Sequence, residues 1–456
     1  MNLTSDTDSF VAQSTPPGIS ALALIRASGS SCTKYAEQLL GKNNSPIPRH
    51  AYFSKLKNGE GELIDEVVWI YYEPGSSYTG EAMIEIMPHG NPLICKMIIE
   101  DFCRRGFRLA EPGEFTKRAY LNKKLKFSQI KGVLETIHAQ SDRALSAARK
   151  RLTGASDNHI KGIVQELTKL RAEIEAYIDF PEDELPPEDK DGPPAQIKKI
   201  ISRLNSLNAT AKNREIIQNG INTLILGSPN AGKSSLLNLL VGHNRALVSK
   251  EAGTTRDYIL EHIEIDGYLI NLFDTAGLNI SPKGELESLG IEHTLELVDQ
   301  SDFFLVVLDS TIDPPELPAS IVSAINPRNC IIVENKIDLP ESRTRNDYFA
   351  DFPHSRISAL DNLSLEDLGS KWKNLIAQNF EIREEEGLMF DLRERSFIQE
   401  SLEELEQAHQ LLSEDSSTEL AAFHLIRASE SLHKINEHVD NEAILDELFS
   451  RFCIGK

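Results

Sequence analysis

Residues 221–238, INTLILGSPNAGKSSLLN, limit the possible folds of this chain more than any other stretch. A short apolar strand pattern leads into residues 227–234, which match G-x-x-x-x-G-K-[ST], and an amphipathic helix pattern follows. Strand, glycine-rich loop and helix in this order are typical of a phosphate-binding loop in an α/β domain. Lys233 would reach the β- and γ-phosphates of a nucleotide, and the Ser234 hydroxyl would bind Mg²⁺.

Four further segments follow this loop in a fixed order: GTTRD at 253–257, DTAG at 274–277, NKID at 335–338 and SAL at 358–360. Thr255 offers Mg²⁺ a second hydroxyl, Asp274 can hold the water shell of the metal, and Gly277 can donate its N–H to the γ-phosphate. Asp338 can accept from the N1–H and amino groups of guanine, which adenine lacks. The order of the motifs therefore predicts a GTP-binding domain.

The residues predicted to bind GTP are Asn230, Ala231, Gly232, Lys233, Ser234, Ser235, Ser249, Lys250, Glu251, Ala252, Gly253, Thr254, Thr255, Asp274, Thr275, Ala276, Gly277, Asn335, Lys336, Asp338, Ser358, Ala359 and Leu360. The predicted ligands of Mg²⁺ are Ser234 and Thr255. Ras-like enzymes orient the attacking water with a Gln directly after DTAG, where this chain has Leu278. Another side chain must orient the water here.

The length and net charge of the chain limit its number of domains and the partners that it can attract. A chain of 456 residues is expected to form about three domains. The net charge of -22 argues against long-range attraction to nucleic acid, so contact with RNA would rest on a local basic patch or on a partner. Five cysteines without a C-x-x-C pair, no signal sequence and no apolar run long enough for a membrane predict a soluble, cytoplasmic protein.

The pattern along the chain predicts a multidomain α/β protein. Residues 1–124 mix strands and helices, including strands at 19–27, 66–72 and 82–87, as expected for an α+β domain. Residues 219–379 have the size and pattern of a Ras-like domain with a mostly parallel mixed sheet and helices on both faces. Helical patterns before and after it, at 125–218 and 380–456, predict one discontinuous helical domain into which the GTP-binding domain is inserted. The acidic, proline-rich residues 179–194 predict an exposed connection.

Several sequence segments resemble one family, the tRNA-modification GTPases called MnmE or TrmE. They are VAQSTPPG at 11–18, PGEFTKRAYLN at 112–122, IDFPEDE at 178–184, GSPNAGKSSLLN at 227–238, AGTTRD at 252–257, DTAGL at 274–278 and FCIGK at 452–456. The resemblance implies a folate-binding N-terminal domain that forms a homodimer. It also implies a partnership with the FAD-dependent protein MnmG in a heterotetramer that modifies carbon 5 of the wobble uridine of tRNA. The carbon would come from methylenetetrahydrofolate, with 5-formyltetrahydrofolate as a related ligand.

The same resemblance implies roles for individual residues. The folate contacts would be Arg26, Glu85, Lys124 and Lys456. Two loops near this site, at 18–20 and 87–89, depart from the family pattern. The ligands of a K⁺ ion that assists hydrolysis would be Asn230, Ser249, Glu251 and Thr254. Glu287 would orient the attacking water, with Glu285 and Glu292 as competitors.

Two other functions also fit the motifs. A ribosome-assembly GTPase shares the AGTTRD loop at 252–257, although FCIGK at 452–456 and the N-terminal domain argue against it. A GTP-dependent conformational regulator, which leaves all uridine chemistry to a partner, is the second alternative. For Cys453 we favour packing as a small apolar residue over a reactive thiol.

Overall fold

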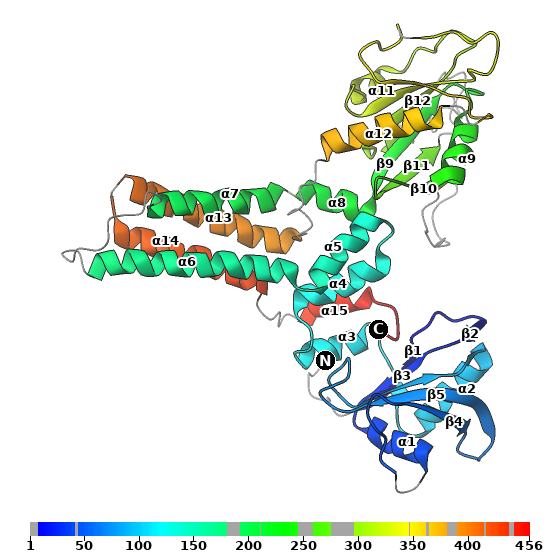
Figure 1. Ribbon diagram of the computed structural model, residues 1–456, viewed down its shortest axis with the longest axis vertical. Helices are drawn as coiled ribbons and strands as arrows, with labels where there is room; N and C mark the ends of the chain where they lie inside the picture. Colours follow the sequence, from blue (N-terminus) through cyan, green and yellow to red (C-terminus); the bar gives the residue numbers. More distant parts are fainter. Residues whose placement is uncertain are drawn as a thin grey trace. The chain divides into compact units, whose positions relative to one another are not determined.

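The computed structural model describes residues 8–41, 44–179, 192–209, 211–244, 259–274, 296–345, 347–361, 364–380, 390–414, 416–436 and 442–456 (Figure 1). The chain divides into two compact units. The first unit holds residues 1–134 together with 436–456, and the second holds residues 135–435.

The first unit contains a six-stranded sheet in the order β4-β5-β6-β3-β1-β8. Its strands are β1 (Phe10–Gln13), β3 (Ile25–Ser28), β4 (Ala51–Lys57), β5 (Leu63–Tyr72), β6 (Met83–Met87) and β8 (Arg108–Leu109). Only the β1–β8 pairing is parallel. The helices are α1 (Ser31–Leu40), α2 (Pro92–Arg104) and α3 (Glu114–Leu121). Trp69, Ile84 and Phe102 are fully buried in its core.

The expected single strand at 19–27 is wrong, because the chain changes partner within it. β2 (Ser20–Leu22) pairs with β7 (His89–Gly90), whereas β3 joins the main sheet. Between them, the Ala23 N–H donates to the Pro88 carbonyl oxygen and the Leu24 N–H to the Thr15 hydroxyl. Residues 20–22 are exposed, so the strand propensity of this run is divided between two different sheets.

The end of the chain packs on this first unit. Phe449 and Phe452, in and after α15 (Glu442–Ser450), pack with Tyr120 of α3 and Phe127 of α4 (Phe127–His138). An antiparallel bridge joins Pro112 to Ile454. The last residues of the sequence are therefore part of the same core as residues around position 120.

The second unit contains another six-stranded sheet, in the order β10-β11-β9-β12-β13-β14. Its strands are β9 (Ile221–Gly227), β10 (Ile259–Ile265), β11 (Tyr268–Asp274), β12 (Phe303–Asp309), β13 (Cys330–Asn335) and β14 (His354–Arg356). All neighbouring strands are parallel except β10 and β11, which form a hairpin. The strands are nearly continuous in apolar residues because helices α9 (Lys233–Asn244), α11 (Ala319–Ala324) and α12 (Leu365–Asn379) accompany the sheet.

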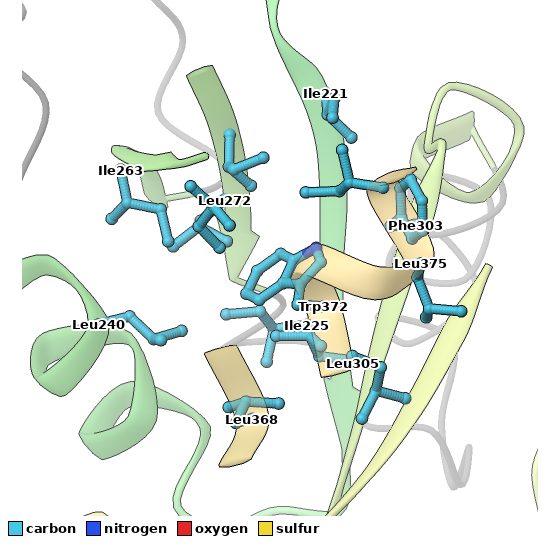
Figure 2. Close-up of a cluster of buried hydrophobic side chains, with 14 of the residues drawn as sticks. Ile221, Ile225, Leu240, Ile263, Leu272, Phe303, Leu305, Leu368, Trp372 and Leu375 are labelled. Atoms are coloured by element: carbon cyan, nitrogen blue, oxygen red, sulfur yellow. The ribbon is translucent and has the colours of Figure 1, made fainter. Parts of the chain in front are cut away.

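Trp372 of α12 lies in the middle of the largest apolar cluster of this unit (Figure 2). Ile225 of β9 and Leu305 of β12 belong to the same cluster, as do Ala144 and Ala147 of α5 (Asp142–Leu152). α5 precedes the predicted GTP-binding sequence by about seventy residues and nevertheless contributes to the core of the second sheet.

Four long helices form a second apolar core in the same unit: α6 (Ala155–Asp179), α7 (Pro193–Ala209), α13 (Leu392–Ser413) and α14 (Thr418–Asn436). α7 begins with two prolines, Pro193 and Pro194, which suit the first turn of a helix. α13 begins with a capping box in which Asp391 and Glu394 bond each other's backbone N–H groups. Most of the predicted connection at 179–194 lies outside the described residues.

A buried arginine joins segments that precede and follow the second sheet in the sequence. Arg151 of α5 is 2% exposed and forms ion pairs with Glu135 of α4, at 2.9 Å, and with Glu394 of α13. Gln218 of α8 (Ala211–Asn219), directly before β9, also donates to Glu135, at 2.8 Å. Because a buried charge is costly without partners, these contacts tie α4, α5, α8 and α13 together.

The multidomain α/β fold class is confirmed by the two mixed sheets and the helical core. The division into units does not separate the second sheet from the helical core, and it places residues 436–456 with the N-terminal sheet. The boundaries at 124, 218 and 379 therefore stay predictions. Within the described ranges, no helix is long and apolar enough to cross a membrane.

Candidate nucleotide-binding site

The loop between β9 and α9 has a backbone that its glycines make possible. Asn230 and Gly232 have positive φ angles of 64° and 95°. A Cβ atom on Gly232 would lie 2.1 Å from Asn335 Nδ2, and one on Gly227 would lie 2.3 Å from the Val307 carbonyl oxygen. Larger residues at either glycine would displace the neighbouring strands β12 and β13 or their side chains.

Lys233 is held over the loop at the start of α9. Its Nζ donates to the carbonyl oxygens of Gly227, at 2.9 Å, and Ser228, at 3.1 Å. Burial lowers the pKa of Lys233, and the nearby Asp274 carboxylate partly offsets this effect. An ammonium group placed at a helix N-terminus in this way suits a bound phosphate.

Ser234 and Asp274 meet at the carboxyl ends of the neighbouring parallel strands β9 and β11. The Ser234 hydroxyl donates to Asp274 Oδ2 at 3.1 Å. A hydroxyl and a carboxylate are the hard oxygen donors that Mg²⁺ prefers, so these two residues fit the predicted metal. The third predicted participant, Thr255, lies outside the described residues.

Asn335, at the end of β13, joins the phosphate-binding loop to the loop at 358–360. Its Nδ2 donates to the Ala231 carbonyl oxygen at 2.9 Å, and its Oδ1 accepts from the Ala359 N–H at 3.0 Å. Ser358 is buried, whereas Asp338 and Leu360 are exposed. The phosphate-binding loop is therefore joined at one edge of the sheet to two motifs that follow it by more than a hundred residues.

The residues that the resemblance assigns to folate fall in the first unit. Arg26 of β3 and Glu85 of β6 face each other in register, and Arg26 Nη2 lies 2.7 Å from Glu85 Oε1. The Tyr72 hydroxyl donates to the other oxygen of Glu85 at 3.0 Å. The Arg26 guanidinium also lies over the rings of Tyr78 and Phe115, at 5.9 and 5.6 Å.

The other two residues of this group come from separate segments. The Phe115 N–H, in the first turn of α3, donates to the Lys456 backbone oxygen at 3.2 Å. Since the ring of Phe115 borders Arg26, the end of the chain lies near the Arg26–Glu85 pair. Lys124 is exposed, and its Nζ donates to the Gly75 carbonyl oxygen at 2.8 Å.

Two family models together match most of the chain. A family model described as "GTP-binding protein TrmE N-terminus" matches residues 9–124, and one described as "MnmE helical domain" matches residues 127–453. A protein from Opitutus terrae described as "tRNA modification GTPase MnmE" is 40% identical over 457 residues, with 98% of this chain and 99% of the relative covered. The chain belongs to the MnmE family of tRNA modification GTPases.

A second MnmE relative, from Aquifex aeolicus, is 37% identical over 98% of this chain and 99% of its own length. Among solved structures, the G domain of the Thermotoga maritima FeoB iron transporter matches 34% of this chain and 98% of its own length, with 23% identity and a TM-score of 0.27. The family assignment rests on the relatives and the family models.

Several residues singled out in the sequence, from the GTP-binding motifs or from the family resemblance, lie outside the described residues, so no contact is assigned to them. They are Ser249, Lys250, Glu251, Ala252, Gly253, Thr254, Thr255, Thr275, Ala276, Gly277, Leu278, Glu285, Glu287 and Glu292. Of the four predicted K⁺ ligands, only Asn230 is described, and its left-handed φ also suits a loop residue without a metal.

The expectation that Cys453 packs as an apolar residue is wrong, because Cys453 is exposed while its neighbour Phe452 is buried. Sequence reasoning also missed residues that contact the predicted sites: Tyr72 and Tyr78 near Arg26, and Asp309 next to Lys336. Asp309 could have been found, because it follows the apolar strand 303–308 just as Asp274 follows its own strand. The aromatic residues carried no comparable signal.

Proposed function

We propose that the chain binds and hydrolyses GTP as a component of tRNA wobble-uridine modification. The observation that carries this proposal is Asn335, whose side chain bonds both the phosphate-binding loop and the loop expected to close over the base. Lys233 follows the phosphate-binding loop and Asp338 follows Asn335 by three residues, so this bridge supports a nucleotide bound between these two segments. Membership of the MnmE family supplies the tRNA part of the proposal.

The residues of the loop bind and orient the nucleotide. Lys233 exchanges its carbonyl partners at Gly227 and Ser228 for the β- and γ-phosphate oxygens, which are stronger acceptors because they are charged. Ser234 and Thr255 would bind Mg²⁺ and Asp274 would hold the water shell of the metal, which would supply positive charge to the phosphates. Asp338 accepts from the guanine base, which selects GTP over ATP.

Glu287 takes the place of the missing glutamine in our proposal, because Leu278 cannot hydrogen-bond water. The carboxylate of Glu287 orients the attacking water toward the γ-phosphate. Asn230, with Ser249, Glu251 and Thr254, would hold a K⁺ ion, which would supply positive charge beside the phosphates.

We place a tetrahydrofolate derivative at Arg26, Glu85, Lys124 and Lys456. The donor set fits this ligand, because a pterin presents N–H donors to a carboxylate and its glutamate tail attracts cations. Arg26 holds the Glu85 carboxylate in one orientation, and Tyr78 and Phe115 provide apolar ring faces beside it. Although both oxygens of Glu85 already accept a hydrogen bond, each can accept another one from the ligand. The homodimer and the MnmG partnership belong to the same proposal.

Steady-state phosphate release from GTP tests the GTPase part. The full chain should hydrolyse GTP but not ATP, and faster in K⁺ than in Na⁺ at equal ionic strength. Lys233→Ala should abolish the activity, whereas Ser323→Ala, an exposed substitution on α11, should leave it unchanged. Equal rates in the two salts would remove the potassium assignment, and equal use of ATP would remove the guanine assignment.

A further inference from the structure

We propose that Asp309 is a positioning residue for guanine nucleotide binding, because it fixes the ammonium group of Lys336. Lys336 Nζ lies 2.6 Å from Asp309 Oδ2. Lys336 is the second residue of the NKID motif, and Asp309 belongs to none of the GTP-binding motifs in the sequence. The inference rests on the proposed GTP site and adds a residue to it.

The carboxylate of Asp309 is itself held firmly at the end of β12. Its Oδ1 accepts from the Thr311 N–H at 3.0 Å and from the Thr311 hydroxyl at 2.6 Å. The other oxygen, Oδ2, remains directed to Lys336. Asp309 therefore presents one fixed acceptor to the lysine, and only 10% of its side-chain surface is exposed.

The backbone places these two side chains together. Asp309 of β12 is the register partner of Asn335 of β13, which directly precedes Lys336. Ser310 reinforces this pairing, because its N–H and hydroxyl both donate to the Asn335 carbonyl oxygen, at 3.1 and 2.7 Å. Asp309 and Ser310 thus support the motif from the neighbouring strand β12, in addition to the bonds that the Asn335 side chain makes with Ala231 and Ala359.

The charge of Asp309 is maintained at neutral pH. Burial alone would raise the pKa of its carboxyl group, but hydrogen bonds from Lys336 and Thr311 outweigh this effect and hold the pKa below its usual value. A lysine side chain has several rotatable bonds, and ordering them costs free energy. Because the ion pair with Asp309 orders the Lys336 side chain before the nucleotide binds, this part of the entropy cost does not reduce the binding affinity.

The test measures binding of a fluorescent GDP analogue and GTP hydrolysis by the full chain. Asp309→Asn should weaken GDP binding roughly tenfold, the effect expected for a lost hydrogen bond to a charged group. KM for GTP should rise more than kcat falls, because the lysine acts in binding. The preference for GTP over ATP should persist, because Asp338 reads the base.

Two further substitutions, one of them also combined with Asp309→Asn, distinguish a positioning role of Asp309 from a structural one. Lys336→Met should weaken binding as much as Asp309→Asn, and the double variant should be no weaker than either single variant. Asp309→Glu keeps the carboxylate and should recover most of the affinity. This second substitution also provides the test if Asp309→Asn does not fold.

Matched controls come from the same loop. Thr311→Val removes one of the two donors that hold Asp309, so it should weaken GDP binding, but less than Asp309→Asn, because the Thr311 N–H and the lysine contact remain. Asp313→Asn changes an 89% exposed carboxylate that pairs with Arg345, and it should have no effect. Wild-type affinity in Asp309→Asn, fully additive losses in the double variant, or an Asp309→Glu protein as weak as Asp309→Asn would overturn the proposal. Failure of the wild-type chain to bind GDP would instead overturn the proposed function.

Discussion

Arg143 of α5 holds Asp266 in the tight turn between β10 and β11. Its Nε donates to the Asp266 carbonyl oxygen at 2.8 Å, and its Nη2 donates to Asp266 Oδ2 at 2.9 Å. The guanidinium also lies 4.3 Å from the centre of the Tyr268 ring. Lys373 of α12 binds the remaining carboxylate oxygen of Asp266 at 2.6 Å.

This turn connects β10 and β11, and the segments predicted to bind and hydrolyse the nucleotide lie before and after this pair of strands in the sequence. β10 begins directly after the segment that contains Thr255, and β11 ends at Asp274, directly before the segment that contains Glu287. Both Asp266 and Gly267 have positive φ angles, as a two-residue hairpin turn requires.

Asp266→Asn should lower the free energy of unfolding by about 1 kcal/mol at pH 7, a value that allows for the partial exposure of the three charged groups. The hydrogen bond from Lys373 lowers the pKa of Asp266, burial opposes this shift, and Arg143 adds to it. Because the folded-state pKa is depressed, this stabilisation is present above the unfolded pKa of about 3.9 and is lost as the pH falls through the folded pKa.

Urea unfolding from pH 7 to pH 3 measures this effect as the difference between wild type and variant. The difference should shrink below about pH 4. Asp351→Asn, at an exposed position, provides the control. A difference that stays constant over the whole range would show that the charge of Asp266 is not what stabilises the turn.

Ser234→Ala should remove the gain in nucleotide affinity that Mg²⁺ provides, on the order of tenfold. The hydroxyl that contacts Asp274 is the metal ligand in our account, so its loss should matter only when the metal is present. Titrations of GDP with Mg²⁺ and with a chelator measure this gain. If the variant keeps the full Mg²⁺ effect, Ser234 is not a ligand.

Gly455→Ala should release the end of the chain from the first unit. Gly455 has a φ of 95°, and a Cβ atom there would lie 2.5 Å from the Gln13 carbonyl oxygen. We expect the substitution to destabilise the packing of the chain end on the first unit by about 1–3 kcal/mol. Faster removal of the terminal residues by carboxypeptidase and weaker binding of 5-formyltetrahydrofolate should both follow. Gly59→Ala, where a Cβ meets nothing within 4 Å, is the matched control.

Glu287→Ala should reduce kcat for GTP hydrolysis by a factor of about 10² or more, while GDP affinity stays within about twofold. The reason is that a water-orienting carboxylate acts on the reaction and not on nucleotide binding. Single-turnover hydrolysis and equilibrium binding measure the two quantities separately. Glu285→Ala and Glu292→Ala should keep most of the activity, and a larger loss in either variant would transfer the role to that residue.

The proximity of several residues predicted to bind the nucleotide follows from the sequence, because parallel strands end at one edge of a sheet. Lys233, Ser234, Asp274 and Asn335 each follow an apolar strand, so their proximity follows from the strand pattern. The pairing of Asp309 with Lys336 needs the strand order as well, because only neighbouring strands bring these positions together. Motif spacing contains no information about strand order.

Contacts between distant parts of the chain were harder to foresee. The Ser14 hydroxyl donates to the Gly455 carbonyl oxygen across 441 residues, and no local pattern announces such a contact. The break between β2 and β3 was missed for a related reason. The apolar run at 19–27 has strand propensity throughout, and the tertiary contacts of Ala23 and Leu24 decide where it changes sheets.

The most direct test of the account is mass spectrometry of wobble-uridine nucleosides. Unmodified tRNA is incubated with MnmG, methylenetetrahydrofolate, GTP and K⁺, with and without this chain, and Lys233→Ala serves as the nucleotide-free control. The account predicts an aminomethyl-type nucleoside that forms only with the wild-type chain. No product, with GTP hydrolysis intact and MnmG known to be active, would contradict the proposed role in tRNA modification.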